Sequence, residues 1–346
     1  MTSTRRDVHY VLLVIMCAGI SARAYAEGEW VKAGVLPHDL RAHASLATAQ
    51  NLYTVGGISF GGRQNAILAA PIAEDQSLQG WETVAQIPVA ISYCTNSVLI
   101  HNGTLYVAGG SITADENSRC VYSAFLFKNG SFGPWVRSEP FPTEGVTATA
   151  SVVANDFLYV IGGAMKDVPQ SAVFYAPIGR LGQLGSWALA QPLPAPLWFH
   201  DAFVERNRLY VVGGASSGDS TKILASVLSA SIESDGTLGA WQTESAVLPS
   251  PIYGAALARV EDRIFLIGGR TTGGGSINDV HVLKLIEQGI AYEGRVTTNL
   301  EPIKYHAVVA RPGSADLYLT GGKLGATGLT DNLAVLRIAA DELAIK

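Results

Sequence analysis

Apolar residues are grouped along this chain in short runs, and six of these runs share one pattern. Residues 52–57 read Leu-Tyr-Thr-Val-Gly-Gly, and residues 317–322 read Leu-Tyr-Leu-Thr-Gly-Gly. The second glycines are residues 57, 110, 163, 214, 269 and 322, so the copies lie 51 to 55 residues apart. Four mostly apolar positions, rich in aromatic and β-branched residues, predict a buried strand with both faces packed. The glycine pair permits a sharp exit from that strand.

Each run has the same neighbours. A proline corner and a small apolar run come before it, as in Leu193-Pro194 followed by residues 202–204. A polar loop, a second apolar strand such as residues 172–175, a turn and a Gly-x-Trp motif come after it. The unit is therefore predicted to hold four short strands. The tryptophans at this place are Trp81, which follows Gly80 directly, and Trp135, Trp187 and Trp241, which stand in Gly-x-Trp motifs.

Four-stranded units repeated at this period are typical of a β-propeller. The double glycine followed at a distance by tryptophan resembles the kelch repeat, and the resemblance covers nearly all of the chain after residue 26. It implies an all-β fold, a six-bladed kelch-type β-propeller with four-stranded blades. In such a ring the loops around the central channel are the expected place for function.

The first 26 residues are interpreted as a signal peptide. Arg5 and Arg6 precede an apolar run over residues 10–20, and residues 24–26 (Ala-Tyr-Ala) have the small-x-small form of a cleavage site. The apolar run is short for a permanent membrane anchor. We therefore expect an exported protein, periplasmic or extracellular, with one propeller domain over residues 27–346.

Charge and motifs narrow the classes of partner. Removing residues 1–26 takes away three of the 24 basic and one of the 29 acidic side chains, which leaves 21 against 28 and a net charge near −7. No basic stripe remains for nucleic acid, and no second apolar stretch is long enough to cross a membrane. The chain also shows no zinc-type Cys/His spacing, calcium loop or Gly-x-Ser-x-Gly motif. We expect no metal or cofactor, and a monomer.

The two ends of the chain carry complementary fragments of the repeat. Residues 29–31 (Glu-Trp-Val) look like a fourth strand without the first three, whereas the last unit stops after residues 333–336 without a tryptophan. We predict that the N-terminal strand completes the last blade, which removes exposed sheet edges. Residues 293–296 (Glu-Gly-Arg-Val) stand where Gly-x-Trp is expected, so this blade is described as degenerate.

Candidate ligand-binding residues cluster at equivalent places in the repeats. They are amphipathic residues that either cap the edge of a core or ring a pocket. Cations that follow the double glycines could converge on an anionic group. The candidates at the entrances of the inner strands are Arg41, His43, Tyr93, His200, Tyr253, Tyr305 and His306, and those after the glycines are Arg63, Arg270 and Lys323.

Cys94 and Cys120 fall in the same predicted blade. An exported pair of cysteines can form a disulfide. One strand separates them, so their Cα atoms are about 9–10 Å apart in a regular sheet, beyond the about 7 Å that a disulfide allows. The bond therefore requires a folded-over loop, and we leave both states open.

Three functions are considered for such a propeller. The first is a binding module for a glycan, a small molecule or a protein at the loop face. The second is a sugar-acid mutarotase or epimerase resembling the N-acetylneuraminate mutarotases, in which His43, His200 or His306 would exchange protons and the cations would hold a carboxylate. The third is a copper radical oxidase resembling galactose oxidase, with ligands drawn from Tyr253, Tyr305, His200, His306 and Cys94.

Overall fold

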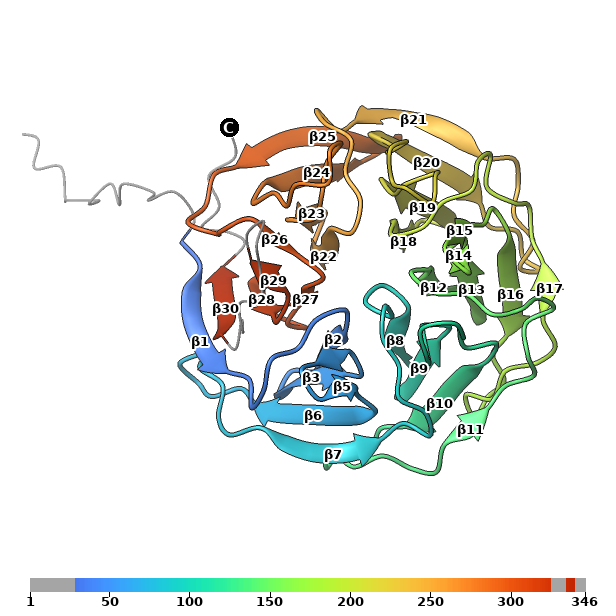
Figure 1. The fold of residues 1–346 in the computed structure, drawn as a ribbon. Helices are drawn as coiled ribbons and strands as arrows, with labels where there is room; N and C mark the ends of the chain where they lie inside the picture. Colours follow the sequence, from blue (N-terminus) through green and yellow to red (C-terminus); the bar gives the residue numbers. More distant parts are fainter. Residues whose placement is uncertain (1–28, 325–333, 340–346) are drawn as a thin grey trace, which may run out of the picture.

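The structure, a computed structural model, describes residues 29–324 and 334–339. Every regular element in these residues is a β-strand, and the strands form six four-stranded antiparallel sheets that radiate from one axis (Figure 1). This confirms the predicted all-β, six-bladed propeller. Within this part of the chain, no helix has the length and apolar character that crossing a bilayer requires. The predicted signal peptide, residues 1–26, lies outside the described residues.

In the first three blades the strands follow chain order from the axis to the rim. Blade 1 contains β2 (Ala44–Ala47), β3 (Asn51–Val55), β6 (Ala66–Pro71) and β7 (Glu82–Gln86); blade 2 contains β8 (Val98–His101), β9 (Thr104–Ala108), β10 (Val121–Phe125) and β11 (Val136–Arg137); blade 3 contains β12 (Ala150–Ala154), β13 (Phe157–Ile161), β16 (Val173–Pro177) and β17 (Ala188–Leu189).

The next two blades repeat this order, and the last blade takes its outer strand from the start of the chain. Blade 4 contains β18 (Asp201–Glu205), β19 (Arg208–Val212), β20 (Ser226–Ser231) and β21 (Gln242–Val247); blade 5 contains β22 (Ala256–Val260), β23 (Arg263–Ile267), β24 (Val280–Ile286) and β25 (Gly289–Val296); blade 6 contains β27 (Ala307–Ala310), β28 (Asp316–Thr320), β30 (Ala334–Ala339) and β1 (Val31–Val35).

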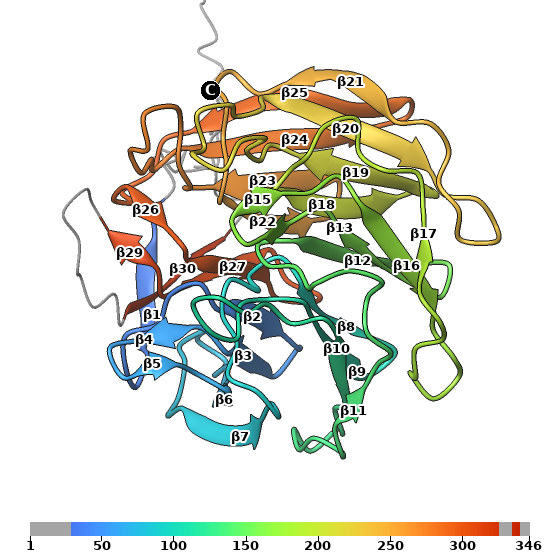
Figure 2. The ribbon, with the colours of Figure 1, turned by 45° about the vertical axis from the view of Figure 1, so that its right-hand side comes forward.

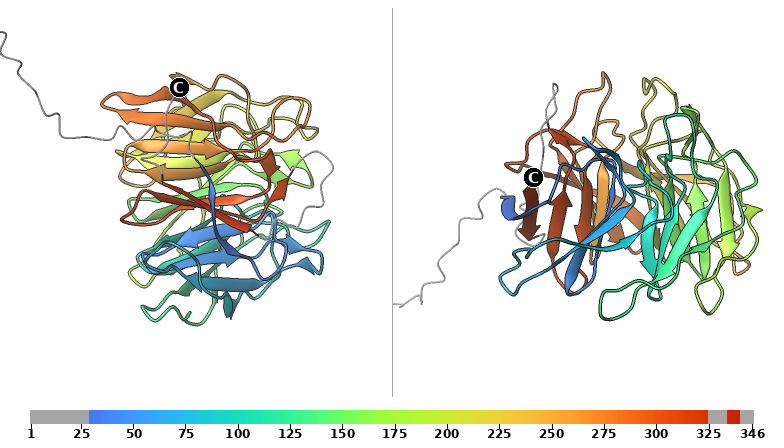
Figure 3. Two further views of the ribbon diagram at one scale, coloured as in Figure 1. Left: turned by 90° about the vertical axis from the view of Figure 1, so that its left-hand side faces the viewer. Right: turned by 60° about the horizontal axis from the view of Figure 1, so that its bottom comes forward.

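Short two-stranded ribbons extend three blades beyond the glycine pairs. Figure 2 and the left view of Figure 3 show two of them, β4–β5 and β26–β29, projecting from one face of the ring, which we call the loop face. The ribbons are β4 (Ile58–Ser59) with β5 (Gly62–Arg63), β14 (Ala164–Met165) with β15 (Val168–Pro169), and β26 (Ile303–Lys304) with β29 (Lys323–Leu324).

The strands that carry the repeated apolar run are the most deeply buried. All five residues of β9 and of β28 are buried, because both faces of each strand pack against neighbouring blades. The tyrosine of the run also ties blades together. Tyr106 Oη donates to the backbone oxygen of Gly182 at 2.8 Å, and Tyr159 Oη donates to that of Gly236 at 2.8 Å. Each acceptor lies in the outer hairpin of the next blade, so these buried hydroxyls are satisfied across the seams.

The ring closes through pairing of β1 with β30. Val31 lies opposite Arg337 in an antiparallel register, and Figure 1 shows β1 in blue beside β30 in red. Trp30 is buried just before β1. Its backbone N–H donates to Asn299 Oδ1 at 2.7 Å, and its carbonyl accepts from Asn299 Nδ2 at 3.1 Å. One side chain thus clamps the start of the chain against the link from blade 5 to blade 6.

Blade 5 is complete, although its sequence lacks the Gly-x-Trp motif. β25 pairs with β24 along its whole length, from Gly289 opposite Ile286 to Val296 opposite Val280. Arg263 and Glu293 form a bidentate ion pair, with both nitrogen–oxygen distances at 2.8 Å. The degenerate motif therefore means that other side chains stand where the tryptophan is expected, and the blade still has all four strands.

Cys94 and Cys120 are free, buried thiols, so the disulfide that the sequence left open is not formed in the structure. The two side chains have different neighbours. Cys94 Sγ lies 3.9 Å from the backbone oxygen of Val55 in blade 1, whereas Cys120 Sγ accepts from Arg137 Nε at 3.1 Å in the outer strand of its own blade. No loop folds over to bring the two sulfurs together.

Candidate functional site

A belt of six residues in the left-handed backbone conformation surrounds the axis, one just before the inner strand of each blade. Their φ angles lie between 51° and 60°. Backbone hydrogen bonds join neighbours in this axial belt. The N–H of Tyr93 donates to Ala42 O at 2.7 Å, and the N–H of Ala42 donates to Tyr305 O at 2.8 Å where the first and last blades meet. The six residues are Ala42, Tyr93, Ala148, Phe199, Gly254 and Tyr305.

Large and small residues alternate around the axial belt. Tyr93, Phe199 and Tyr305 come from blades 2, 4 and 6, and each pair of their rings has centroids 5.9 to 6.3 Å apart in edge-to-face or tilted contact. Such contacts add to the stabilisation from burial. The blades between them contribute only alanine or glycine, which leaves room for the three rings to meet. We call these three residues the aromatic plug.

The aromatic plug separates two cavities. On the loop face lies a pocket of about 370 Å³ that all three plug residues line. On the other side lies a cavity of about 20 Å³, lined by the same rings together with Thr95, Asn96 and other residues of the channel wall. A space of this size holds about one water molecule. The larger pocket is therefore closed at its floor and accessible from the loops above it.

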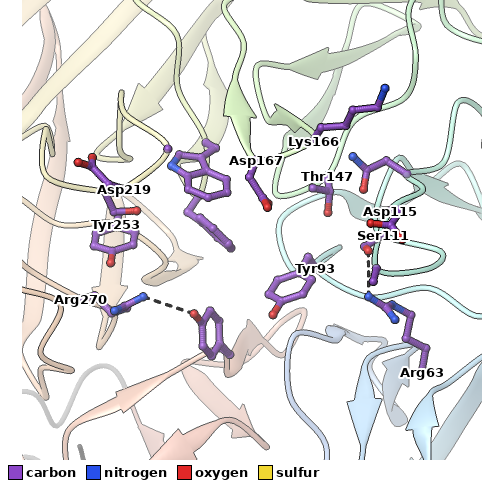
Figure 4. A pocket seen from close by; sticks show the side chains of 17 residues that line it. Arg63, Tyr93, Ser111, Asp115, Thr147, Lys166, Asp167, Asp219, Tyr253 and Arg270 are labelled. Atoms are coloured by element: carbon purple, nitrogen blue, oxygen red, sulfur yellow. Dashed lines mark hydrogen bonds between the residues drawn. The ribbon is translucent and has the colours of Figure 1, made fainter.

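Arg63 lies on one side of the pocket, where hydroxyl groups hold its guanidinium. Its Nε donates to Ser92 Oγ at 3.2 Å, and its Nη2 donates to Ser111 Oγ at 3.2 Å, the bond drawn in Figure 4. These partners are neutral. In the described part of the chain, no carboxylate lies within ion-pair distance of Arg63.

Arg270 is held in a comparable way by blade 5 and its neighbour. Its guanidinium carbon lies 5.1 Å from the centre of the Tyr253 ring, its Nε donates to Gly274 O at 3.1 Å, and its Nη1 lies 3.4 Å from Tyr305 Oη. No ion pair joins it to a carboxylate of residues 29–324 or 334–339. Two half-buried guanidinium groups thus face the pocket with neutral partners only.

Three carboxylates also line the pocket. Asp115, Asp167 and Asp219 come from blades 2, 3 and 4, and Figure 4 shows Asp115 near Ser111 on the side of Arg63, and Asp219 near Tyr253 on the side of Arg270. Lys166 lines the pocket as well, but it forms an ion pair with Glu144 at 3.0 Å. The mouth of the pocket is therefore bipolar, because it carries carboxylates as well as the two guanidinium groups.

Burial, and then proximity to Tyr305, raises the pKa of Tyr93 against the opposing effect of Arg41 and Arg63. Burial likewise raises the pKa of Tyr253 despite the nearby Arg270. Both hydroxyls therefore remain protonated at neutral pH and can donate a hydrogen bond. The arginine, tyrosine and other aromatic side chains that line the pocket can together bind a planar anionic group, and this binding requires no metal ion.

Comparison with known proteins finds kelch-repeat relatives. The Kelch-like protein terF of Aspergillus terreus is 24% identical over 241 residues, which cover 66% of this chain and 49% of terF. Alpha-scruin of Limulus polyphemus is 24% identical over 253 residues, which cover 69% of this chain and 26% of alpha-scruin. Together with the ring of six blades, these likenesses support a kelch-repeat propeller family. This chain is a six-bladed β-propeller similar to kelch-repeat proteins.

The likeness is limited in extent. The Kelch repeat and BTB domain-containing protein 12 of Danio rerio is 28% identical over 127 residues, which cover 36% of this chain and 20% of that protein. The kelch propeller thus spans half or less of the length of these relatives. No protein-family model matches the chain. Activities and partners of the relatives are therefore not transferred by the likeness alone.

The structure brings five of the ten candidate residues together around this pocket. They are Arg63, Tyr93, Tyr253, Arg270 and Tyr305. Arg41 and Lys323 lie nearby without lining it. Arg41 is bridged to Ile58 through its backbone and is close enough to affect the pKa of Tyr93, and Lys323 lies opposite Lys304 in the β26–β29 ribbon.

The three candidate histidines are buried between blades and do not line the axial pocket, although His306 lines the small cavity beneath the plug. His43, His200 and His306 are at most 2% exposed. His43 Nε2 lies 2.8 Å from Thr320 Oγ1, and His306 Nε2 lies 3.0 Å from the backbone oxygen of Ile267. Burial is the largest cause that lowers the pKa of His43 to about 3 and those of His200 and His306 to about 4. They are neutral parts of the core at ordinary pH.

The glycine pairs explain why these imidazoles fit. A Cβ on Gly162 would lie 2.9 Å from His200 Cε1, and a Cβ on Gly321 would lie 2.7 Å from His43 Cε1. Each imidazole therefore packs on the first glycine of the preceding kelch unit. This placement removes the proton donors considered for a mutarotase from the pocket. His200, His306 and Cys94 do not line the pocket that Tyr253 and Tyr305 line, and the described residues hold no group of three or more His, Cys, Asp or Glu side chains that could bind a metal ion.

The ten candidate residues leave out part of the pocket. Phe199 occupies the same repeat position as Tyr93 and Tyr305, and comparison of the six units places it at an inner-strand entrance, but it was not among the candidates. The acidic residues follow the second glycine by four or five positions in three consecutive blades, which is a regular signal. The loop residues of the wall, such as Ser111 and Ser220, carry no comparable pattern.

A larger cavity of about 590 Å³ lies on the opposite face between blades 2 and 3. Exposed apolar side chains line it, among them Phe125, Phe127 and Leu181. It draws on two blades only, whereas residues from all six blades converge on the pocket at the axis. The axial pocket therefore combines more of the unpaired charge, and we regard it as the candidate functional site.

Proposed function

We propose that this kelch propeller is a binding module that receives an acidic segment of a partner protein in the axial pocket. The observation that carries this proposal is the pair of guanidinium groups, Arg63 and Arg270, which face a closed pocket and have only neutral partners among the described residues. A carboxylate that enters between them gains charge-assisted hydrogen bonds.

A protein segment suits the site better than a free small molecule for two reasons. The pocket of about 370 Å³ lies at the small end of the range for ligand pockets and suits one or two side chains. The rim above it is built from loops of several blades, which a larger partner can contact. Kelch propellers also commonly serve as protein-binding modules.

The bipolar mouth adds a sequence preference for the partner. Asp167 and Asp219 would repel a run of acidic residues, because like charges at an interface cost binding energy. They would instead attract a basic residue near the acidic one. The proposed ligand is therefore a short segment in which an Asp or Glu is followed closely by a Lys or Arg. We further propose that the protein is exported, on the strength of residues 1–26.

The experiment is a binding screen with short peptides that carry acidic, basic, mixed or neutral sequences, run beside a glycan array. We expect mixed acidic–basic peptides to bind. Arg63→Ala is expected to weaken binding at least about tenfold, because a hydrogen bond to a charged group contributes about 1.5–3 kcal/mol. Arg180→Ala, an exposed residue on the opposite face, is the matched control and should bind as the parent does. Binding of glycans alone, or of peptides with no effect of Arg63→Ala, would overturn the proposal.

A further inference from the structure

Two lysines face each other in the ribbon of blade 6, next to the pocket residue Tyr305 and outside the lining of the axial pocket. Lys304 and Lys323 are register partners in the antiparallel β26–β29 ribbon. Side chains directly opposite each other in such a pair lie on the same face, with Cβ atoms about 5 Å apart. Like charges in that position are destabilising. The ribbon therefore holds an unfavourable charge pair at the loop face.

The equivalent bridge in the other five blades, next to the axial belt, carries no pair of lysines. Each blade bridges the residue before its axial-belt member to the residue after its glycine pair. Blade 5 places Tyr253 opposite Arg270, where the ring faces the cation. The remaining bridges are Arg41 with Ile58, Ser92 with Ser111, Thr147 with Ala164, and Trp198 with Ala215. The double lysine is thus a feature of blade 6 and not of the repeat.

Arg270 adds a third positive charge next to this pair. The backbone N–H of its neighbour Gly269 donates to Ile303 O at 2.9 Å, which holds the start of the blade 5 loop against β26. Burial is the largest cause that lowers the pKa of Lys304, followed by the positive charges of Arg270 and Lys323. Across residues 29–324 and 334–339, no carboxylate forms an ion pair with any of the three.

We propose that Lys304, Lys323 and Arg270 form a subsite for a doubly charged oxyanion, a phosphate or sulfate group, beside the axial pocket. The inference deepens the proposed function, on which it rests for the identity of the larger ligand. A phosphate monoester carries a charge of about −1.5 to −2 at neutral pH and offers three acceptor oxygens. It therefore matches this cluster better than a carboxylate, which neutralises one charge.

The test uses inorganic phosphate and inorganic sulfate as probes, with acetate as the singly charged comparison, at low ionic strength. Binding is measured by calorimetry and by the NMR signals of the lysine side chains. We expect saturable binding of both dianions and at least about tenfold weaker binding of acetate. Lys304→Met and Lys323→Met should each weaken phosphate binding about tenfold. Lys222→Met, at an exposed lysine of the blade 4 loop, should leave it unchanged.

A conservative variant guards against loss of structure. Replacement of both lysines by arginine keeps the charge and should retain phosphate binding. Absence of saturable phosphate binding, or equal binding by Lys304→Met and the parent, would overturn the subsite. Loss of phosphate binding in Arg63→Ala with full retention in both methionine variants would also overturn it, because the anion would then sit in the axial pocket.

The two proposals fail separately. Unmodified acidic peptides test the axial pocket through Arg63, whereas the inorganic anions test the subsite through the lysines. A serine-phosphorylated peptide and a sulfated sugar distinguish the source of the anion. Tighter binding of the phosphopeptide than of its unmodified form, lost in Lys304→Met, supports a phosphoprotein ligand, and the same result with the sugar alone supports a sulfated glycan. Either result supports the subsite.

Discussion

Tyr93 and Tyr305 meet across the propeller axis with ring centroids 5.9 Å apart and ring planes at 87°. They come from blades 2 and 6, and the small residue Ala42 of blade 1 lies between them in the axial belt. This alternation lets aromatic rings from every second blade reach the axis, so the channel is blocked without a loop or a ligand. The pocket exists because the channel is closed.

The aromatic plug is expected to stabilise the fold as well as form the pocket floor. Phe199 contacts Tyr93, Tyr305 and further rings at centroid distances from 4.8 to 6.3 Å. Phe199→Ala should lower the free energy of unfolding by about 2–4 kcal/mol. Urea denaturation of the variant and the parent measures this change in the free energy of unfolding. Phe60→Ala, at a residue 65% exposed, is the control and should change stability by no more than about 0.5 kcal/mol. Equal effects of the two variants would mean that the plug does not stabilise the fold.

Much of the fold could be predicted from the sequence because the constraint repeats. A strand packed on both faces needs an apolar run, and a glycine pair is needed where the next blade approaches. The sequence repeats both features six times, first in residues 52–57. Ring closure also followed from the chain's ends, since β1 supplies what blade 6 lacks. The outer strand of blade 5 was only described as degenerate, because the Arg263–Glu293 pair that lies beside it has no counterpart in the Gly-x-Trp motif.

The pocket was only partly predictable. Tyr305 and His306 are adjacent in sequence, yet Tyr305 lines the pocket and His306 packs in a seam. The left-handed conformation of Tyr305, with φ of 57°, sends successive side chains in different directions. That conformation is unusual for a residue other than glycine and leaves no mark in the sequence. Residue type and repeat position therefore located the site, but they could not distinguish the residues that line the pocket from the buried residues that pack behind them.

The close approach at the glycine pairs can be tested with Gly162. A Cβ there would lie 2.6 Å from the backbone oxygen of Leu197, at a φ of 53°. Gly162→Ala should lower the free energy of unfolding by about 3 kcal/mol or more, because neither the backbone angle nor the seam can accept the methyl group. Gly273→Ala provides the control, since its φ is 90° and nothing lies within 4 Å of the added atom; its cost should be about 1 kcal/mol. Similar costs would show that the seam does not resist the methyl group.

Asp201 is expected to destabilise the fold at neutral pH. It is 6% exposed and has no ion pair among the described residues, and burial raises its pKa well above the usual range despite a hydrogen bond with Asn96. The folded state keeps a proton that the unfolded state releases above about pH 4, so stability falls as pH rises. Asp201→Asn should therefore raise the free energy of unfolding at pH 7.5 by about 1–3 kcal/mol, with no gain near pH 4.

Denaturant titrations at the two pH values measure this effect. Asp262→Asn removes an exposed carboxylate that pairs with Lys284 at 3.7 Å. It should change stability by no more than about 1 kcal/mol at either pH. A loss of stability in Asp201→Asn at pH 7.5 would mean that the carboxylate is charged and paired in the folded protein.

The seam histidines produce a pH dependence of the opposite sign. Their pKa values are lowered by burial, to about 3 for His43 and about 4 for His200 and His306. Below about pH 6.5 the unfolded chain takes up protons that the folded chain excludes, so stability is lost as pH falls from 6.5 toward 4. Each histidine should contribute a slope of up to about 1.4 kcal/mol per pH unit in this window.

The measurement is best made in the Asp201→Asn background, which removes the opposing carboxylate. His306→Gln keeps a donor for the backbone oxygen of Ile267, which now lies 3.0 Å from His306 Nε2. This variant should reduce the slope of the free energy of unfolding against pH, between pH 6.5 and 4.5, by the contribution of one proton, which is up to about 1.4 kcal/mol per pH unit. His43→Gln should have the same effect. A flat profile in that background would show that the buried imidazoles accept protons in the folded state, because the seams would then have to open or admit water to hold the charge.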